Sequence, residues 1–143
     1  MGNRAVIAFK SSPTVGIYLH WNGGPESILA FVNAAKKRGA RPPKNDATYA
    51  FGALASTIGL FIHQPSKYRR ELLSFGIGPL SDLDTYNGDN GLFWIHDDWR
   101  VSRDCGYSGS VSYDGLGKDG REQHDGIVEQ IMHLDTAKSA KAA

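Results

Sequence analysis

Residues 3–10 read NRAVIAFK and residues 16–21 read GIYLHW, and both runs are rich in β-branched and aromatic side chains. Such side chains favour extended strands, and the polar segment SSPT at 11–14 is typical of a turn between two strands. The two runs therefore predict an N-terminal β-hairpin. The sequence NGG at 22–24 breaks the second run and predicts a sharp turn after it.

Two amphipathic helices are expected after this turn. Pro25 suits the first turn of a helix, and apolar residues recur at helical spacing over 28–35. A second helix is predicted to begin at a polar cap, residue 45 or 46, and to continue to residue 62.

The rest of the chain has the pattern of short strands, turns and one more helix. Strands are predicted at 72–77, 92–95 and 99–102, with a weaker one at 107–113. Residues 106–120 are rich in glycine, which predicts a mobile or irregular loop. A final helix is expected over 121–137 and a frayed tail over 138–143.

These elements predict the fold class α+β, in a single domain over residues 1–143. The N-terminal β-hairpin leads into two helices, and the later strands complete an antiparallel sheet. The final helix carries Ile127, Ile131 and Leu134 on one face, and few neighbours in the sequence can cover that face. We therefore expect the C-terminal helix to lie at the subunit interface of a homo-oligomer.

Length, charge and cysteine content limit the classes of function. The chain has 143 residues, of which 41% are hydrophobic and 22% charged, as in soluble globular proteins and unlike disordered ones. Its 16 Lys and Arg against 15 Asp and Glu give a net charge of +1, which argues against a generic binder of duplex DNA and leaves room for a small anionic ligand. The lone Cys105 excludes an intramolecular disulfide and fits a reducing cytoplasm. No apolar run approaches the roughly 18 residues that span a bilayer, so we expect a soluble intracellular protein and no membrane partner.

Two glycine-containing turns are candidate binding elements. The turn at 22–24 leads into a helix, and backbone N–H groups at a helix start can bind an anion, although a sharp turn by itself also requires glycine. The segment DLDTYNGDNG at 82–91 superficially matches a calcium loop, but its glycine falls one place late and Phe93 stands where such a loop needs Glu. We interpret this segment as a polar turn whose asparagines could read the edge of a base or a ribose.

Aromatic and charged residues leave several alternatives open. Aromatic side chains on the strands could stack on an adenine or belong to the core. Arg100 and Arg103 could bind a phosphate or form ion pairs with the acidic residues beside them. His20, His96 and Asp97 could converge on a metal ion, which keeps a metal-dependent nucleotide hydrolase as an alternative. A protein-interaction module that uses the terminal helix and has no small ligand is the third class.

Three blocks, GNRAVI at 2–7, IYLHWNGG at 17–24 and NGDNG at 87–91, together resemble small phage and prophage proteins of the first Thoeris anti-defence type. The resemblance extends from residue 2 to roughly residue 105. Proteins of this type are sponges for the signalling nucleotide that bacterial TIR-domain immune enzymes make. The resemblance implies a non-catalytic protein of the host cell cytoplasm that binds glycocyclic ADP-ribose, or a related cyclic nucleotide, without cleaving it. It also implies assembly through dimers into a larger oligomer, with a hexamer as one candidate, and no cofactor or metal.

The resemblance further suggests where the ligand lies. It implies a site built on the polar turn at 87–91, on an aromatic residue of a preceding strand and on an arginine of a following strand. The candidate ligand-binding residues are Phe75, Asn87, Asn90, Arg100, Arg103, Trp21, Asn22, Gly23 and Gly24.

Overall fold

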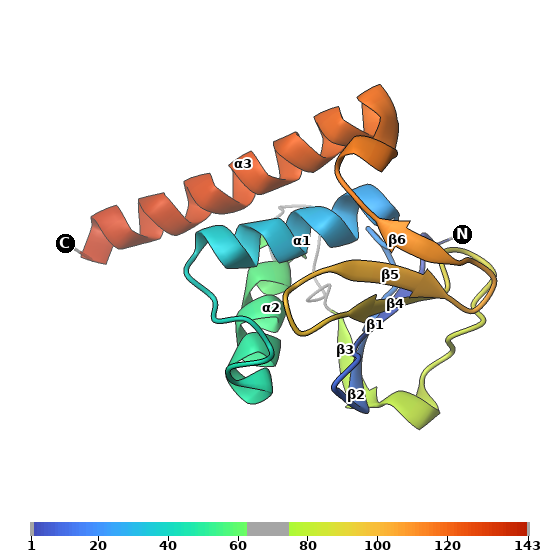
Figure 1. Cartoon of the computed structure of the whole chain (residues 1–143). Helices are drawn as coiled ribbons and strands as arrows, with labels where there is room; N and C mark the ends of the chain where they lie inside the picture. The colour runs from blue at the N-terminus through green and yellow to red at the C-terminus, as the bar shows by residue number, and fades with distance from the viewer. Residues whose placement is uncertain (1, 63–74, 143) are drawn as a thin grey trace.

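A computed structural model describes residues 2–62 and 75–142, with side chains up to Asp135. A six-stranded sheet in the order β3-β2-β1-β4-β5-β6 carries the helices on one face, as Figure 1 shows. The strands are β1 (Ala5–Phe9), β2 (Ser12–Leu19), β3 (Gly76–Pro79), β4 (Leu92–Ile95), β5 (Val101–Asp104) and β6 (Gly109–Val111). The helices are α1 (Pro25–Lys37), α2 (Ala47–Ile62) and α3 (Gly117–Ala142). The expected fold class, α+β, is confirmed.

The N-terminal half follows the sequence expectation closely. β1 and β2 form the predicted antiparallel hairpin, and α1 and α2 follow it. The Asp46 carboxylate accepts a hydrogen bond of 3.2 Å from the N–H of Tyr49, so Asp46 caps α2. The turn expected over 11–14 is wrong, because β2 already begins at Ser12 and the chain reverses at residues 10–11.

The sheet is mixed, so the expectation of an antiparallel sheet is wrong. β1 pairs in parallel with β4, with Phe9 opposite Ile95, whereas the other neighbouring strands are antiparallel. β4 follows a long connection through the helices and β3. It enters the sheet at the end where β1 begins, so the two strands run in the same direction.

The later elements are shifted from their predicted positions. The strand expected at 99–102 starts at Val101, because Trp99 adopts a positive φ of 72° in the turn before it. Of the strand expected at 72–77, β3 contains only residues 76–77, and residues 72–74 lie outside the described part of the chain.

The irregular loop expected over 106–120 is also wrong. It contains β6, a short 3-10 helix (Asp114–Leu116) and the start of α3 at Gly117. The weaker strand expected at 107–113 is confirmed in part, since β6 lies within those bounds. The predicted helix bounds of 121 and 137 are too narrow, since α3 continues through the expected frayed tail to Ala142.

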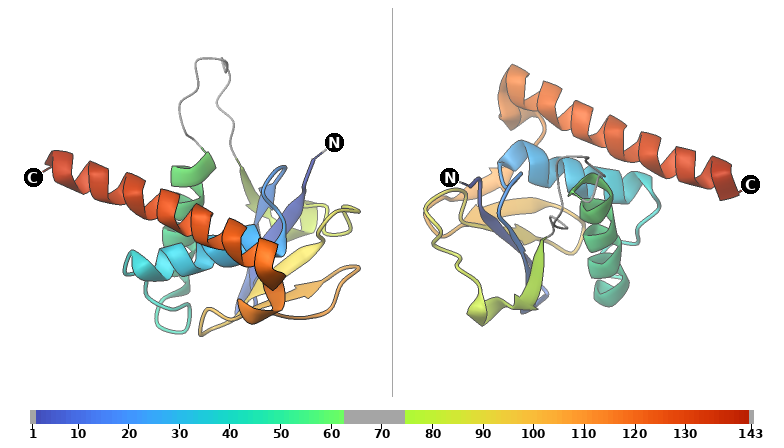
Figure 2. Two further views of the ribbon diagram at one scale, coloured as in Figure 1. Left: turned by 90° about the horizontal axis from the view of Figure 1, so that it is seen from above. Right: turned by 180° about the vertical axis from the view of Figure 1, so that it is seen from behind.

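The main core lies between the sheet and the helices. Ile127 and Ile131 of α3 are buried in it, and Leu134 is half-buried. α3 crosses the outer side of α1, away from the sheet, as the views in Figure 2 show. The apolar face of α3 is therefore covered within the chain, so this face does not by itself require a second subunit. A subunit interface at α3 stays a prediction. None of the helices in the described part of the chain combines the length and apolar character that crossing a membrane requires.

The opposite face of the sheet carries a smaller apolar cluster. Val6 and Ala8 of β1 are buried there, and Leu80 and Leu83 from the segment that leads to β4 pack against them. A Cβ atom on Gly16 would lie 2.9 Å from Cδ1 of Leu83, so glycine at this position permits the close approach. This packing fixes the start of the segment that ends in the polar turn at 87–91.

Candidate functional site

Asn87 organises the polar turn at 87–91. Its side chain is only 4% exposed, and its Oδ1 accepts hydrogen bonds of 3.1, 3.2 and 3.1 Å from the N–H groups of Asp89, Asn90 and Gly91. Its Nδ2 donates to the main-chain oxygens of Asp84 and Gly91, both at 3.1 Å. The polar atoms of this side chain are therefore used within the turn itself. Asn87 acts as a structural residue there, and a base could reach its amide only by opening the turn.

Asn90 and Asp89 join the turn to the residues just before β1. The N–H of Asn90 and its Nδ2 both donate to the oxygen of Arg4 at 3.1 Å, and Nδ2 also donates to Oδ1 of Asn3. In return, the main-chain N–H and the Nε of Arg4 donate to Oδ2 of Asp89 at 3.0 and 2.8 Å. Their side-chain hydrogen bond raises the pKa of Arg4 and lowers the pKa of Asp89.

The turn at 22–24 reaches the same corner from β2. The N–H of Gly23 donates to the oxygen of Asn3 at 2.9 Å, and Asn22 takes the left-handed conformation with φ 60°. A Cβ atom on Gly23 would lie 2.5 Å from the oxygen of Asn3 and 2.7 Å from Cβ of Ala5. Glycine at 23 is therefore required by close backbone packing and not by its dihedral angles, since the positive φ in this turn belongs to Asn22.

Arg103 of β5 completes the corner. Its Nη2 donates to the main-chain oxygen of Asn90 at 3.0 Å and lies 3.4 Å from Oδ1 of Asn90. The guanidinium carbon lies 3.7 Å from the ring centre of Tyr107 and 5.0 Å from that of Phe93. Its Nε is buried without a hydrogen-bond partner, and burial lowers the pKa of Arg103, an effect that Tyr107 and Glu26 oppose. We call the set Asn3, Arg4, Gly23, Asn90, Arg103 and Tyr107 the Arg103 corner.

No family model, curated protein sequence or solved structure matches the chain.

Glu26 places a carboxylate beside the Arg103 corner. A Cβ atom on Gly24 would lie 2.4 Å from Oε1 of Glu26, so this side chain folds back over the start of α1. The negative charge of Glu26 also acts on Arg103. A carboxylate of the chain thus occupies the helix start at which an external anion would be expected.

Two of the predicted binding residues lie away from the Arg103 corner. Arg100 is exposed and forms an ion pair of 2.8 Å with Asp98, in the turn at the other end of β4 and β5. Phe75 precedes β3 and packs against the main core, and three strands lie between β3 and β5. Of the two candidate arginines, only Arg103 therefore lies beside the polar turn.

Trp21 leads from β2 into the turn at 22–24. Its side chain is 51% exposed and meets the ring of His20 edge-on, with 5.1 Å between the ring centres. The Nδ1 of His20 also forms a hydrogen bond of 2.9 Å with the hydroxyl of Tyr18. An exposed indole is suited to stacking on a flat ligand.

The histidine arrangement considered for a metal ion does not form. His20 follows β2 at the end of the sheet where β1 begins, whereas His96 follows β4 at the end where β1 finishes. His96 instead forms a hydrogen bond of 2.8 Å with Ser102. Within the described residues, no group of three or more His, Cys, Asp or Glu is placed to hold a metal ion.

Several residues of the Arg103 corner escape sequence reasoning. Asn3 and Arg4 belong to a block that marks the resemblance, but their bonds to the distant turn at 87–91 leave no local signal. Tyr107 falls in a segment for which the sequence indicates both a weak strand and an irregular loop, and neither expectation places its ring on Arg103. The position of Glu26 in the first turn of α1 does predict a carboxylate near the helix start, although not its proximity to Arg103.

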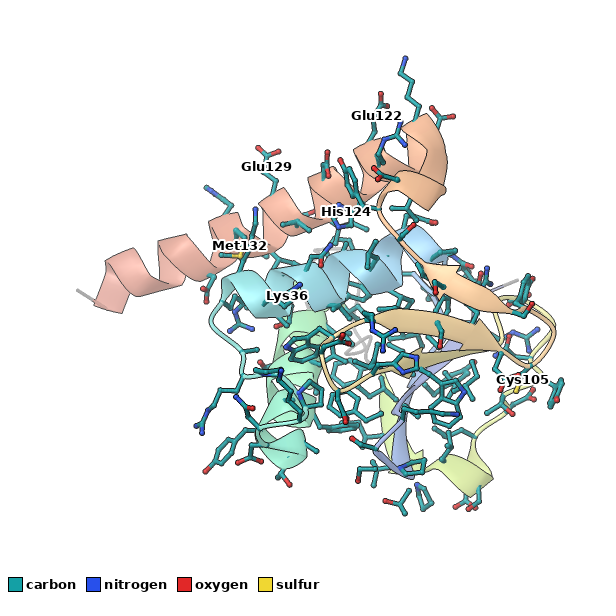
Figure 3. The ribbon with its side chains drawn as sticks, viewed as in Figure 1. Lys36, Cys105, Glu122, His124, Glu129 and Met132 are labelled. Carbon is teal, nitrogen blue, oxygen red and sulfur yellow. The ribbon has the colours of Figure 1, made fainter. Side chains whose placement is uncertain are left out.

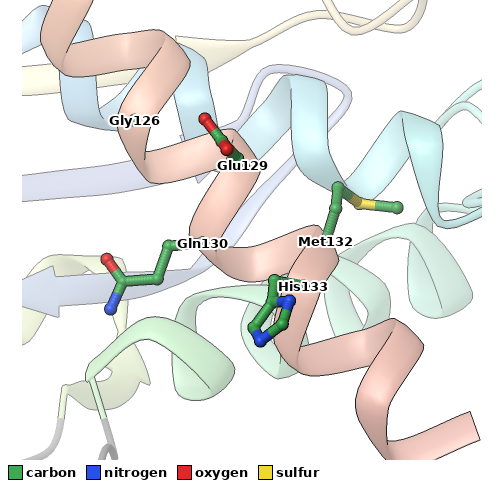
Figure 4. Close-up of a pocket in the computed structure, with 5 residues that line it drawn as sticks. All are labelled: Gly126, Glu129, Gln130, Met132 and His133. Atoms are coloured by element: carbon green, nitrogen blue, oxygen red, sulfur yellow. The ribbon is translucent and has the colours of Figure 1, made fainter. Parts of the chain in front are cut away.

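Other hollows lie elsewhere on the described surface. One of about 550 Å³ follows α3 and is lined by Gly126, Glu129, Gln130, Met132 and His133, which Figure 4 shows. A second, of about 590 Å³, is lined by residues of both α1 and α3. The buried His124 lies beside it and forms hydrogen bonds of 2.9 Å with Asn33 and with Asp125 (Figure 3). A third, of about 200 Å³, lies between the first hairpin and α2. None of these three is lined by a predicted ligand-binding residue.

Proposed function

We propose that this chain binds a small, doubly anionic nucleotide of the cyclic ADP-ribose type at the Arg103 corner and sequesters it without cleaving it. The observation that carries the proposal is the convergence of residues 22–24, Asn90 and Arg103, which come from three separate parts of the sequence. Sequestering such a signal in the cytoplasm of an infected cell would block TIR-dependent anti-phage defence, which is what the resemblance to the Thoeris anti-defence proteins implies.

The chemistry of the corner suits such a ligand. A guanidinium with donors in a plane matches the oxygens of a phosphate, and partial removal from water strengthens that interaction. Arg103 is held in place by Tyr107 and Asn90, so little freedom is lost when a phosphate binds. The exposed ring of Trp21 offers a surface on which an adenine can stack.

Sequestration at cellular concentrations also requires a high affinity for the nucleotide. Nanomolar binding corresponds to about −12 kcal/mol, which favours a ligand enclosed on several sides. We therefore include in the proposal a homo-oligomer, a dimer or larger, in which a second copy of the chain closes the Arg103 corner.

Retention and release of the nucleotide test the proposal against the hydrolase alternative. The protein is incubated with glycocyclic ADP-ribose, separated from unbound nucleotide by filtration, heated to unfold it, and the released material is identified by mass spectrometry. We expect intact glycocyclic ADP-ribose in a stoichiometric amount. An altered nucleotide would show an enzyme, and an empty protein fraction would contradict nucleotide binding. The separation of His20 from His96 supports the choice of binding over hydrolysis by that group of residues.

A further inference from the structure

The connection from α1 to α2 concentrates positive charge that the whole-chain balance hides. Residues 36–44 read KKRGARPPK, with five Lys and Arg and no acidic residue, in a chain whose net charge is only +1. Lys36, Lys37, Arg41 and Lys44 are exposed. We call these four residues, together with Tyr49 in the first turn of α2, the basic strip.

The four exposed cations of the basic strip are not neutralised by close carboxylates. Among the described residues, none of the four takes part in an ion pair. Arg38, which lies between them, is different, because it contacts Asp135 at 3.4 Å and donates to Thr57 at 2.7 Å. Lys36 and Lys37 do complement the negative end of α1, but that role leaves their ammonium groups in solvent.

Two carboxylates near the basic strip, those of Asp46 and Asp97, do not form ion pairs with it. Asp46 accepts the N–H of Tyr49 as the cap of α2. Asp97 meets the strip through its backbone, whose oxygen accepts the N–H of Lys44 at 3.1 Å. Asp125 and Glu129 of α3 line a hollow together with Lys36 and Lys37. The positive charge of the strip that lies away from α3 therefore comes from Arg41 and Lys44, and neither forms an ion pair with a described carboxylate.

Tyr49 adds an aromatic surface to the strip. Its side chain is 66% exposed, and the guanidinium carbon of Arg41 lies 5.1 Å from the ring centre. Beside unpaired cations, an open ring is suited to stacking on a base while the cations meet phosphates.

The backbone of the strip is ordered without a ligand. Gly39 ends α1 with φ 93°, and its N–H donates to the oxygen of Lys36 at 3.0 Å. The oxygen of Pro42 accepts the N–H of Asn45 at 2.9 Å. A polyanion would therefore bind a surface whose main chain is already in place.

We propose that the basic strip binds single-stranded nucleic acid, with phosphates on its cations and a base on Tyr49. A single strand is favoured over a duplex because its bases can leave the stack and reach an exposed ring. The strip is separate from the Arg103 corner. Figure 3 shows Lys36 on α1, well away from Cys105, which lies two residues after Arg103 at the right-hand edge of the molecule. The proposal does not depend on the function proposed for that corner.

Fluorescence anisotropy of a labelled oligonucleotide of about 20 thymidines tests the proposal on the full chain. We expect micromolar binding in about 50 mM salt that weakens steeply with salt, by a slope of about −0.7 for each phosphate contacted. Arg41→Glu combined with Lys44→Glu should weaken binding at least about tenfold. Tyr49→Ala should weaken it about fivefold or more, and Tyr49→Phe, which keeps the ring, should bind like the parent. Lys118→Glu, an exposed cation on α3, is the matched control and should change nothing.

Several results would overturn the proposal. The strip does not bind nucleic acid if the anisotropy stays constant at low salt, or if the double variant, shown to be folded by its melting curve, binds like the parent. Equal binding of a duplex of the same length, or unchanged binding by Tyr49→Ala, would show that no base stacks on Tyr49. Equally tight binding of polyglutamate would assign the surface to an acidic protein partner instead.

Discussion

The guanidinium of Arg103 donates a hydrogen bond of 3.0 Å to the main-chain oxygen of Asn90. This bond fastens β5 to the polar turn at 87–91, and Asn90 in turn holds the residues before β1. The side chain that is best placed to meet an anion is therefore also part of the framework of its site. For substitutions in the corner, both ligand affinity and the stability of the fold therefore have to be measured.

The first prediction concerns Asn87. Asn87→Ala should lower the free energy of unfolding by about 3 kcal/mol, because it leaves several N–H groups of the turn without their buried acceptor. Urea denaturation measures this change. Asn45→Ala, which removes an exposed amide, is the control and should stay within about 0.5 kcal/mol of the parent. Equal stability of the two variants would show that Asn87 does not hold the turn.

The second prediction separates the two adjacent glycines before α1. Gly23→Ala should destabilise the fold by about 1–3 kcal/mol, since its Cβ would press on the backbone of Asn3. Gly24→Ala should cost about 0.5 kcal/mol or less, because Gly24 has an ordinary φ of −69° and its Cβ would meet only the movable carboxylate of Glu26. The sequence suggests that the dihedral angles of the sharp turn at 22–24 require glycine, but the positive φ belongs to Asn22. Thermal unfolding of both variants shows which substitution destabilises the fold more. A larger loss of stability for Gly24→Ala than for Gly23→Ala would refute the prediction.

The third prediction is a pH dependence of stability from the Arg4–Asp89 pair. The pKa of Asp89 is lowered in the folded chain by its hydrogen bonds to Arg4. Stability from this pair is therefore fully present above the unfolded carboxyl pKa, near 3.9, and is lost as the pH falls through the lower folded value. Asp98, Asp104 and Asp125 shift in the same direction, so Asp89→Asn should remove only part of the acid sensitivity.

Melting temperatures at pH 7 and pH 3 test this dependence. The difference between the two should be smaller for Asp89→Asn than for the parent. An unchanged difference would mean that the ion pair contributes no pH-dependent stability.

Local sequence accounts for the elements but not for how they pair. The first hairpin and the two helices follow from side-chain propensity, Pro25 and the cap at Asp46, all of which act within a few residues. The parallel pairing of β1 with β4 joins Phe9 to Ile95, and no local signal marks a contact so distant in sequence. For the same reason the sequence assigns the apolar face of α3 to a second subunit, although α1 and α2 already cover it.

In the candidate site, too, the local features are visible in the sequence and the distant contacts are not. The turn at 87–91 is visible in the sequence because Asn and Gly favour turns, yet the consequence that Asn87 is used up inside it needs the geometry. Arg100 and Arg103 differ by only three positions, but a hairpin turn sends one to Asp98 and the strand carries the other to Asn90.

The fourth prediction concerns Glu26. Glu26→Gln should tighten binding of an anionic nucleotide by roughly tenfold, because it removes a negative charge beside Arg103 that repels the ligand. A titration calorimeter measures the two dissociation constants. Glu122→Gln, an exposed carboxylate near the start of α3, is the matched control and should leave affinity unchanged (Figure 3). Weaker binding by Glu26→Gln would mean that Glu26 assists the ligand.

The comparison of Arg103→Ala with Arg100→Ala in titrations with glycocyclic ADP-ribose tests the central claim most directly. Both variants lose one positive charge, but only Arg103 lies in the corner with Asn90 and Tyr107. We expect Arg103→Ala to lose about 1.5–3 kcal/mol of binding free energy or more, and Arg100→Ala to bind like the parent. Absence of saturable heat with the parent protein, or equal affinities of the two variants, would contradict nucleotide binding at the Arg103 corner.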